Sequence, residues 1–355
     1  MKKILFLLLG VVAFAACKDD DDNGWDNALS PGSKFQTEIT LLSKSVKEGS
    51  SGVDWPYNLF STEFTLVDGE HDGAPVVSLS GLDLDGYYCR LSLPTSVFNN
   101  DRIYYLVALA DRCLNNKSTI LSVKLDGYLE RVGKEVFMGA SLLEELTIGP
   151  RLRTIGDWAF RACPKLPILV WNNSTAEIKI GGWAFAECTA LETVDIAVKE
   201  AHIESGAFMD CTGLNVVTIS GEKLDFDDDV FMGCTGLVNV TIRGEELSFR
   251  KGVFDGCTGL KKLTLGNMGK TLEGGFFLDF ASLEDVVIES GLKVVKNGAF
   301  KDCPNLKTVD FPGTLDRIEA GAFQNCPSLE IIYITGGDHL VEIDELPEGA
   351  HVVYD

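Results

Sequence analysis

Phenylalanine recurs at a fixed spacing through the last two thirds of the chain. Successive members lie 23 residues apart, except for one interval of 25 residues. A fixed period of this length is typical of stacked supersecondary units, which form a solenoid rather than a globular domain. The repeating residues are Phe137, Phe160, Phe185, Phe208, Phe231, Phe254, Phe277, Phe300 and Phe323.

The other apolar positions keep the same period. Counting from each phenylalanine, position +6 is leucine in every coil, and positions +9 and +11 are apolar and mostly β-branched. The resulting pattern, L-x-x-V-x-I, predicts a short strand whose +9 and +11 side chains point inward while +8 and +10 point outward. The fold class predicted is therefore a β-rich solenoid with about 23 residues per coil, in which neighbouring coils share one core.

The repeat cycle resembles a known family. Two segments, Leu143 to Cys163 and Leu283 to Cys303, join this strand pattern to x-x-x-L-x-x-I and G-x-x-A-F-x-x-C. They resemble the BspA-like leucine-rich repeats of bacterial cell-surface proteins, over about residues 114–343. The resemblance implies a leucine-rich-repeat solenoid that binds partners, since similar proteins are associated with adhesion to extracellular-matrix proteins.

Three departures from the repeat predict local changes. Ala140 and Phe280 replace the cysteine that seven other coils carry at position +3, and two extra residues lie between Trp171 and Ile180. We interpret them as an end coil, a repacked coil and a local bulge, none of which changes the fold.

The N-terminus predicts export and lipid anchoring. Met1-Lys2-Lys3 and the apolar run from Ile4 to Ala16 form a signal peptide over residues 1–16, too short to span a bilayer permanently. Ala15 and Ala16 before Cys17 resemble a bacterial lipobox, which implies acylation of Cys17. The acidic tether at 17–30 begins with residues 18–22, which resemble a signal for the outer face of the outer membrane; the alternative is a solvated acidic spacer.

Charge narrows the partners. The net charge is −22, and becomes −24 (−22 − 2) once Lys2 and Lys3 leave with the signal peptide. An acidic surface repels nucleic-acid phosphates and anionic lipids. We therefore expect no nucleic-acid binding, and membrane contact through the lipid anchor only.

Residues 31–100 lack the repeat and predict a small antiparallel β domain ahead of the solenoid, which is assigned to 101–355. Strand-like segments lie at 37–42, 63–67, 75–79 and 87–93, separated by Asp-Gly turns. Residues 101–115 place apolar side chains on one broad face and predict a helix that caps the first coil. Residues 350–354 predict a closing strand.

Candidate chemistry is sparse. The cysteines at position +3 are interpreted as buried, inert thiols, while a disulfide between Cys89 and Cys113 stays open. Asp225, Asp227, Asp228 and Asp229 would suit calcium if a loop gathered them, but a solvated face is the favoured interpretation. No motif for catalysis, metal or phosphate binding stands out, so we expect no enzyme activity and no cofactor.

Two functions remain open. The first is a cell-surface module for binding an extracellular protein or glycan, in adhesion to host or neighbouring-cell components. The second is an accessory lipoprotein of a surface carbohydrate-uptake assembly, in which the β domain binds and the solenoid is a spacer. Oligomeric state is open in both. For the first function, outward strand residues form the predicted binding surface, namely Ile168, Val170, Asp195, Val216, Thr218, Thr241, Thr264, Val287, Ile331 and Tyr333.

Overall fold

The computed structural model describes residues 13–14, 34–41, 58–71, 74–82, 89–93, 96–99, 102–277, 280–337 and 339–355. It divides into two compact units, an N-terminal unit (Met1–Cys163) and a C-terminal unit (Pro164–Asp355). Cys17, the acidic tether at 17–30 and all of the signal peptide except Ala13 and Phe14 lie outside the described residues. Within the described part of the chain, there is no helix long and apolar enough to cross a membrane.

The N-terminal unit begins with mostly antiparallel strands. Strand β3 pairs antiparallel with β2 and β4, and β6 pairs antiparallel with β7, while the pairs β4–β7 and β1–β6 are parallel. The bounds are β1 (Ala13–Phe14), β2 (Lys34–Leu41), β3 (Asn58–His71), β4 (Ala74–Leu82), β6 (Ser96–Asn99) and β7 (Arg102–Leu109).

Parallel solenoid pairing starts within the same unit. Strands β5 (Cys89–Ser92), β8 (Ile120–Leu125) and β10 (Glu145–Ile148) form one parallel sheet. The end of β7 leads a second parallel row through β9 (Arg131–Val132) to β11 (Thr154–Ile155). Coil pairing therefore begins at β5, inside the region 31–100 that the sequence assigns to a separate β domain.

The capping helix predicted for residues 101–115 is wrong. Residues Arg102–Leu109 form strand β7, which pairs with both β4 and β6. The segment is rich in aromatic and branched residues, and a short apolar run fits a helix or a strand equally well by spacing alone. Pairing on both edges decides for the strand, and Leu106 and Leu109 are buried.

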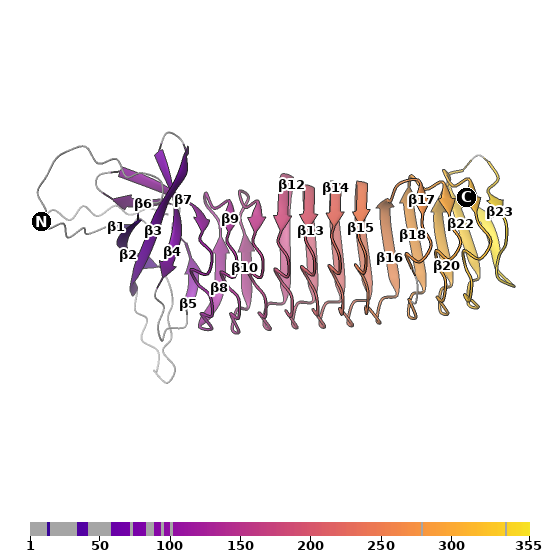
Figure 1. Cartoon of the computed structure of the whole chain (residues 1–355), viewed down its shortest axis with the longest axis horizontal. Coiled ribbons are helices and arrows are strands. Elements are labelled where there is room, and N and C mark those ends of the chain that lie inside the picture. Colours follow the sequence, from indigo (N-terminus) through magenta and orange to yellow (C-terminus); the bar gives the residue numbers. More distant parts are fainter. Residues whose placement is uncertain are drawn as a thin grey trace, which may run out of the picture. The chain divides into compact units, whose positions relative to one another are not determined.

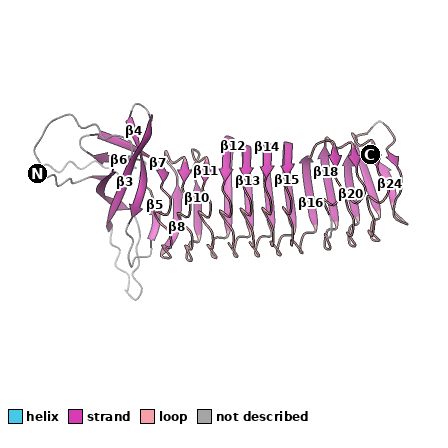
Figure 2. Ribbon diagram, viewed as in Figure 1, coloured by secondary structure: helices cyan, strands magenta, loops and turns pink. Residues whose placement is uncertain are grey.

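The C-terminal unit is a stack of parallel coils (Figures 1 and 2). Each strand pairs in parallel with its counterpart 23 residues on, as Thr193 does with Val216. The strands are β12 (Ile168–Ile180), β13 (Thr193–Ile203), β14 (Val216–Phe226), β15 (Asn239–Phe249), β16 (Lys262–Asn267), β17 (Thr271–Leu272), β18 (Asp285–Ser290), β19 (Val294–Val295), β20 (Thr308–Pro312), β21 (Arg317–Ile318), β22 (Ile331–Thr335), β23 (Glu342–Ile343) and β24 (His351–Tyr354).

The predicted solenoid is confirmed, and no residue of the described ranges is helical. The closing strand predicted at 350–354 is β24, which pairs in parallel with β22. The predicted bulge is also confirmed, because the β12–β13 register shifts between Asn173 and Glu177.

The inward rows form the core of each unit. In the C-terminal unit the rings of Phe208 and Phe231 stack at 5.3 Å, and those of Phe277 and Phe300 at 4.6 Å. Phe280, in place of a cysteine, packs edge-on against Phe277 at 5.9 Å. Leu237 in the +6 row has no exposed surface, as the repeat predicts. Burial of such rows supplies most of the stability, since each coil is apolar on its inner side.

Candidate binding surface

The outward strand positions form two columns across the C-terminal unit, which we name the strand face. Parallel register sets each outward residue directly beside its counterpart in the next coil. The binding residues predicted from the sequence all lie on this face. Its first column is Ile168, Thr193, Val216, Asn239, Lys262, Asp285, Thr308 and Ile331, and its second is Val170, Asp195, Thr218, Thr241, Thr264, Val287, Asp310 and Tyr333.

Exposure varies along the strand face. Ile168 and Val170, both on β12, are 48% and 43% exposed, which is high for large apolar side chains. Tyr333 and Ile331, on β22, are half-buried. Thr264 is only 7% exposed and offers a partner little surface, unlike the other predicted residues. The apolar pair on β12 is therefore the most accessible part of the predicted surface.

Polar groups near β18 to β22 are hydrogen-bonded to one another. The hydroxyl of Thr308 donates to Oδ1 of Asp285 at 2.5 Å, and the hydroxyl of Thr335 donates to Oδ1 of Asp310 at 2.8 Å. A partner that displaced these bonds would leave desolvated carboxylates behind, which is costly. Recognition at this part of the face thus falls to its apolar members, such as Val287.

An ion pair borders the strand face. Nε of Arg243 on β15 lies 2.7 Å from Oε1 of Glu289 on β18, two coils further on. The residue between them in the stack is Gly266, whose missing side chain lets the arginine pass. A Cβ at Gly266 would also lie 2.7 Å from the backbone nitrogen of Gly244, so the close approach of these two coils needs glycine.

Alternating charges at position +7 lie beside the face. The carboxylate of Glu284 is 2.6 Å from Nζ of Lys307 and 3.1 Å from Nζ of Lys261. Hydrogen bonds from Lys307 and then Lys261 lower the pKa of Glu284. The three residues belong to consecutive coils, so this ladder keeps a carboxylate charged at the edge of the face.

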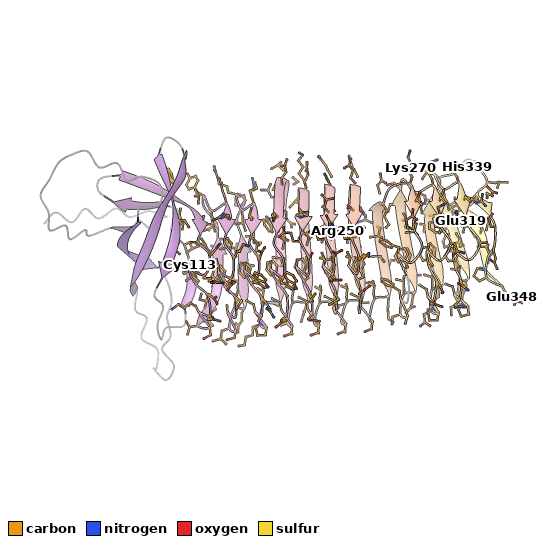
Figure 3. The ribbon with its side chains drawn as sticks, in the orientation of Figure 1. Cys113, Arg250, Lys270, Glu319, His339 and Glu348 are labelled. Atoms are coloured by element: carbon orange, nitrogen blue, oxygen red, sulfur yellow. The ribbon has the colours of Figure 1, made fainter. Side chains whose placement is uncertain are left out.

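The aspartates of residues 225–229 have separate partners. Oδ1 of Asp227 lies 2.9 Å from Nε of Arg250 (labelled in Figure 3), and Oδ1 of Asp228 accepts from the backbone nitrogen of Lys251 at 3.1 Å. Burial raises the pKa of Asp229. In the described residues there is no group of three or more side chains arranged to hold a metal ion. The favoured interpretation of this segment, a solvated face rather than a calcium loop, agrees with this geometry.

The cysteines are part of the core. The thiol of Cys234 donates to the carbonyl of Phe208 at 3.1 Å, and Cys257 does the same to Phe231 at 3.2 Å. Burial raises the pKa of Cys211 and of Cys257. A thiol that resists ionisation is a poor nucleophile, so the predicted inert role is supported.

Cys113 belongs to the N-terminal unit. It is buried as a free thiol, and burial raises its pKa to about 12 (Figure 3). The disulfide with Cys89, which the sequence left open, is therefore not formed.

One feature near β24 escaped the sequence patterns. Residues 345–348 line a hollow of about 950 Å³ together with the turn that contains Phe323. The repeat rows do not mark this hollow, because its lining residues lie in turns. The signal that was available is spacing, since strand β24 starts too few residues after β23.

These coils, with their inward leucine, phenylalanine and cysteine rows, define a parallel β-solenoid of leucine-rich repeats. The chain belongs to the family described as BspA type leucine rich repeat region, whose model matches residues 108–238 and 225–345. No curated protein matches the sequence.

Several solved structures are similar in fold. The leucine rich repeat protein TpLRR of T. pallidum is 24% identical, with 56% of this chain and 87% of that chain covered and a TM-score of 0.43. A leucine-rich repeat protein from Bacteroides ovatus is 19% identical, with 82% and 98% covered and a TM-score of 0.33. The pneumococcal vaccine antigen PcpA is 12% identical, with 83% and 86% covered and a TM-score of 0.43.

Proposed function

We propose that this protein is a non-catalytic binding module that attaches to a protein partner through the strand face. The observation that carries the proposal is the exposed apolar pair Ile168 and Val170, set at the start of aligned outward columns. Exposed apolar residues on a regular surface commonly mark contacts, and leucine-rich repeat proteins generally bind rather than catalyse.

The size of the strand face suits a protein. The face runs over β12 to β22, and eight parallel strands at a spacing of about 4.8 Å extend for about 34 Å. Standard protein interfaces bury roughly 800 Å² on each partner, which a face of this length supplies. Apolar residues at both ends favour a protein over a glycan, with Ile168 and Val170 at one end and Tyr333 at the other.

The test begins with a binding partner. Residues 18–355, without the acylation site, are screened against arrays of matrix proteins and glycans, and the affinity for each hit is then measured. Val170→Glu and Tyr333→Glu should each weaken protein binding by about tenfold or more, because each buries a charge at an apolar contact. Ser248→Glu adds the same charge at an exposed position of β15 outside the face and should leave affinity unchanged.

Other results would contradict the proposal. If both face variants bind as tightly as wild type while substitutions within 31–100 abolish binding, the β domain carries the function. Hits confined to glycans would exchange the protein partner for a carbohydrate.

We also propose that the module is displayed at the cell surface, lipid-anchored to the outer membrane through Cys17. The apolar signal peptide and the cysteine that follows it support this, as do the acidic residues at 18–22. Protease added to intact cells should remove the protein, and Cys17→Ser should release it from the membrane fraction. Membrane attachment together with protection from protease would place it on the periplasmic side.

A further inference from the structure

The last turn of the C-terminal unit is shorter than the turns before it. From the end of β17 at Leu272 to the start of β18 at Asp285 is 13 residues, and β21 to β22 repeats this distance. From the end of β23 at Ile343 to the start of β24 at His351 is only 8 residues (351 − 343). The final turn therefore lacks five residues (13 − 8) that the earlier turns contain.

The missing residues change what covers the phenylalanine row. In earlier coils this turn carries the ring that stacks on its neighbour, as Phe323 stacks on Phe300 at 5.0 Å. One period after Phe323 stands Leu346, whose half-buried side chain is smaller and not aromatic. The short turn thus leaves the hollow of about 950 Å³ between the Phe323 turn and residues 345–348. This volume is within the range of ligand sites, roughly 300–1,000 Å³.

The lining of the hollow combines apolar surface with negative charge. Phe323, Pro327 and Leu346 supply apolar side chains. Among the described residues that line it, the charged ones are Glu345 and Glu348, and both are exposed. Figure 3 shows Glu348 at the end of the C-terminal unit that carries β23. No basic residue belongs to this lining, so a ligand would meet an uncompensated negative site.

Basic residues of the same coils already have carboxylate partners. Nζ of Lys296 lies 2.8 Å from Oε1 of Glu319, and the guanidinium of Arg317 lies 2.7 Å from Oδ2 of Asp344. These pairs do not involve Glu345 or Glu348. Charge complementarity therefore points to a cation that a partner brings.

We propose that this hollow binds a basic peptide segment of a partner protein. An arginine or lysine head lies between Glu345 and Glu348, and an apolar neighbour packs over Phe323 and Leu346. Arginine suits such a site because its planar guanidinium pairs with carboxylates while its stem covers apolar surface. The site is separate from the strand face and does not depend on the function proposed for that face.

The test uses a fluorescein-labelled hexapeptide in which arginine alternates with leucine. A second hexapeptide replaces each arginine by citrulline, which keeps the shape and removes the charge. Residues 18–355 are titrated into each peptide, and the dissociation constant is measured by fluorescence anisotropy. The arginine peptide should bind at least about tenfold more tightly than the citrulline peptide, as expected for two partly screened ion pairs.

A charge-matched pair of variants locates the binding. The double variant Glu345→Gln, Glu348→Gln should weaken arginine-peptide binding by about tenfold. The control, Glu245→Gln with Glu246→Gln, removes two exposed carboxylates from β15 and should change binding less than about twofold. Val170→Glu, on the strand face, should also leave this affinity unchanged.

The proposal is overturned if both double variants lose affinity equally, because binding would then follow net charge alone. Equal affinity for the two peptides, or no binding of the arginine peptide by wild type, overturns it as well. Thermal midpoints of the double variants equal to wild type would show that exposed glutamates were removed without unfolding the last coil.

Discussion

Two blocks of coils in the C-terminal unit use the same repeat in different ways. In the long-strand block, β12 to β15, each coil has one strand of 11 to 13 residues (Figure 1). In the split-strand block, β16 to β23, each coil has one strand of 5 or 6 residues and another of 2. Both blocks keep the inward leucine and phenylalanine rows, so the difference does not come from the core.

The cause is the backbone between the two halves of each coil. In the split-strand block Gly269, Gly291 and Gly336 have φ values of +87°, +82° and +80°, a region that L side chains avoid and that ends a strand. In the long-strand block Gly221 and Gly244 lie inside β14 and β15 and continue the pairing. Backbone handedness, rather than hydrophobic period, thus decides whether a strand runs through the coil.

The largest expected effect tests what the two blocks share. Leu237→Ala in the long-strand block and Leu306→Ala in the split-strand block each truncate a fully buried leucine. Each should lower the free energy of unfolding by about 2 to 5 kcal/mol, because the cavity cannot collapse between stacked coils. Thermal and urea unfolding measure the loss.

Thr241→Ala, on the outward side of the Leu237 coil, is the control and should stay within about 0.5 kcal/mol of wild type. A thermal midpoint unchanged by Leu237→Ala would show that the +6 row does not point inward.

The sequence predicts this shared core well, and the blocks less well. Leucine at position +6 fixes the period, the inward side and the strand start, because a buried row tolerates few residue types. The bulge in β12 was equally readable, since two extra residues shift the register between Asn173 and Glu177. A glycine inside the repeat is ambiguous, however, because Gly221 extends a strand while Gly291 ends one.

The candidate surfaces show the same limit. Strand alternation placed Ile168 and Val170 outward, and their exposure follows from that pattern. It could not show that Thr264 is buried, because burial of an outward residue depends on neighbouring coils. The predicted helix at 101–115 failed for a related reason, since pairing with β4 and β6 is a tertiary property. The hollow near Leu346 needs the length of one turn compared with the others.

The next prediction tests the cause of the split. Gly336→Ala meets nothing within 4 Å, so its cost is the φ of +80° alone, about 1 kcal/mol. Gly291→Ala has a similar φ, but its Cβ would also collide with Oδ1 of Asn267, which accepts from the backbone nitrogen of Gly269 at 2.9 Å. Losing that bond should raise the total to about 2 kcal/mol, measured by urea unfolding.

The contrast between the two glycines is informative. Equal losses in Gly291→Ala and Gly336→Ala would mean that Asn267 moves without cost. No loss in either variant would contradict the role given to left-handed glycine in splitting the strands.

A smaller effect is expected where the two blocks meet. Arg243 at the end of the long-strand block pairs with Glu289 in the split-strand block across Gly266. Their side chains are 58% and 33% exposed, so solvent screens the pair. A double-mutant cycle with Arg243→Met and Glu289→Gln should give a coupling below about 1 kcal/mol that falls further in high salt. A larger, salt-independent coupling would show that the pair holds the blocks together.

The smallest expected effect is acid sensitivity confined to the split-strand block. Lys261, Glu284 and Lys307 alternate in charge there, whereas Asn215 and Val238 hold the equivalent positions of the long-strand block. Because the lysines lower the pKa of Glu284 below its ordinary 4.5, its stabilising effect is complete above pH 4.5. That effect is lost as the pH falls through the lowered value. The thermal midpoint of Glu284→Gln should therefore lie below wild type at pH 7 and approach it as the pH drops from 4.5 to about 2. Glu192→Gln, beside neutral Asn215, is the matched control in the long-strand block. A difference for Glu284→Gln that persists unchanged in acid, or that equals the control at every pH, would show that the charge ladder does not distinguish the two blocks.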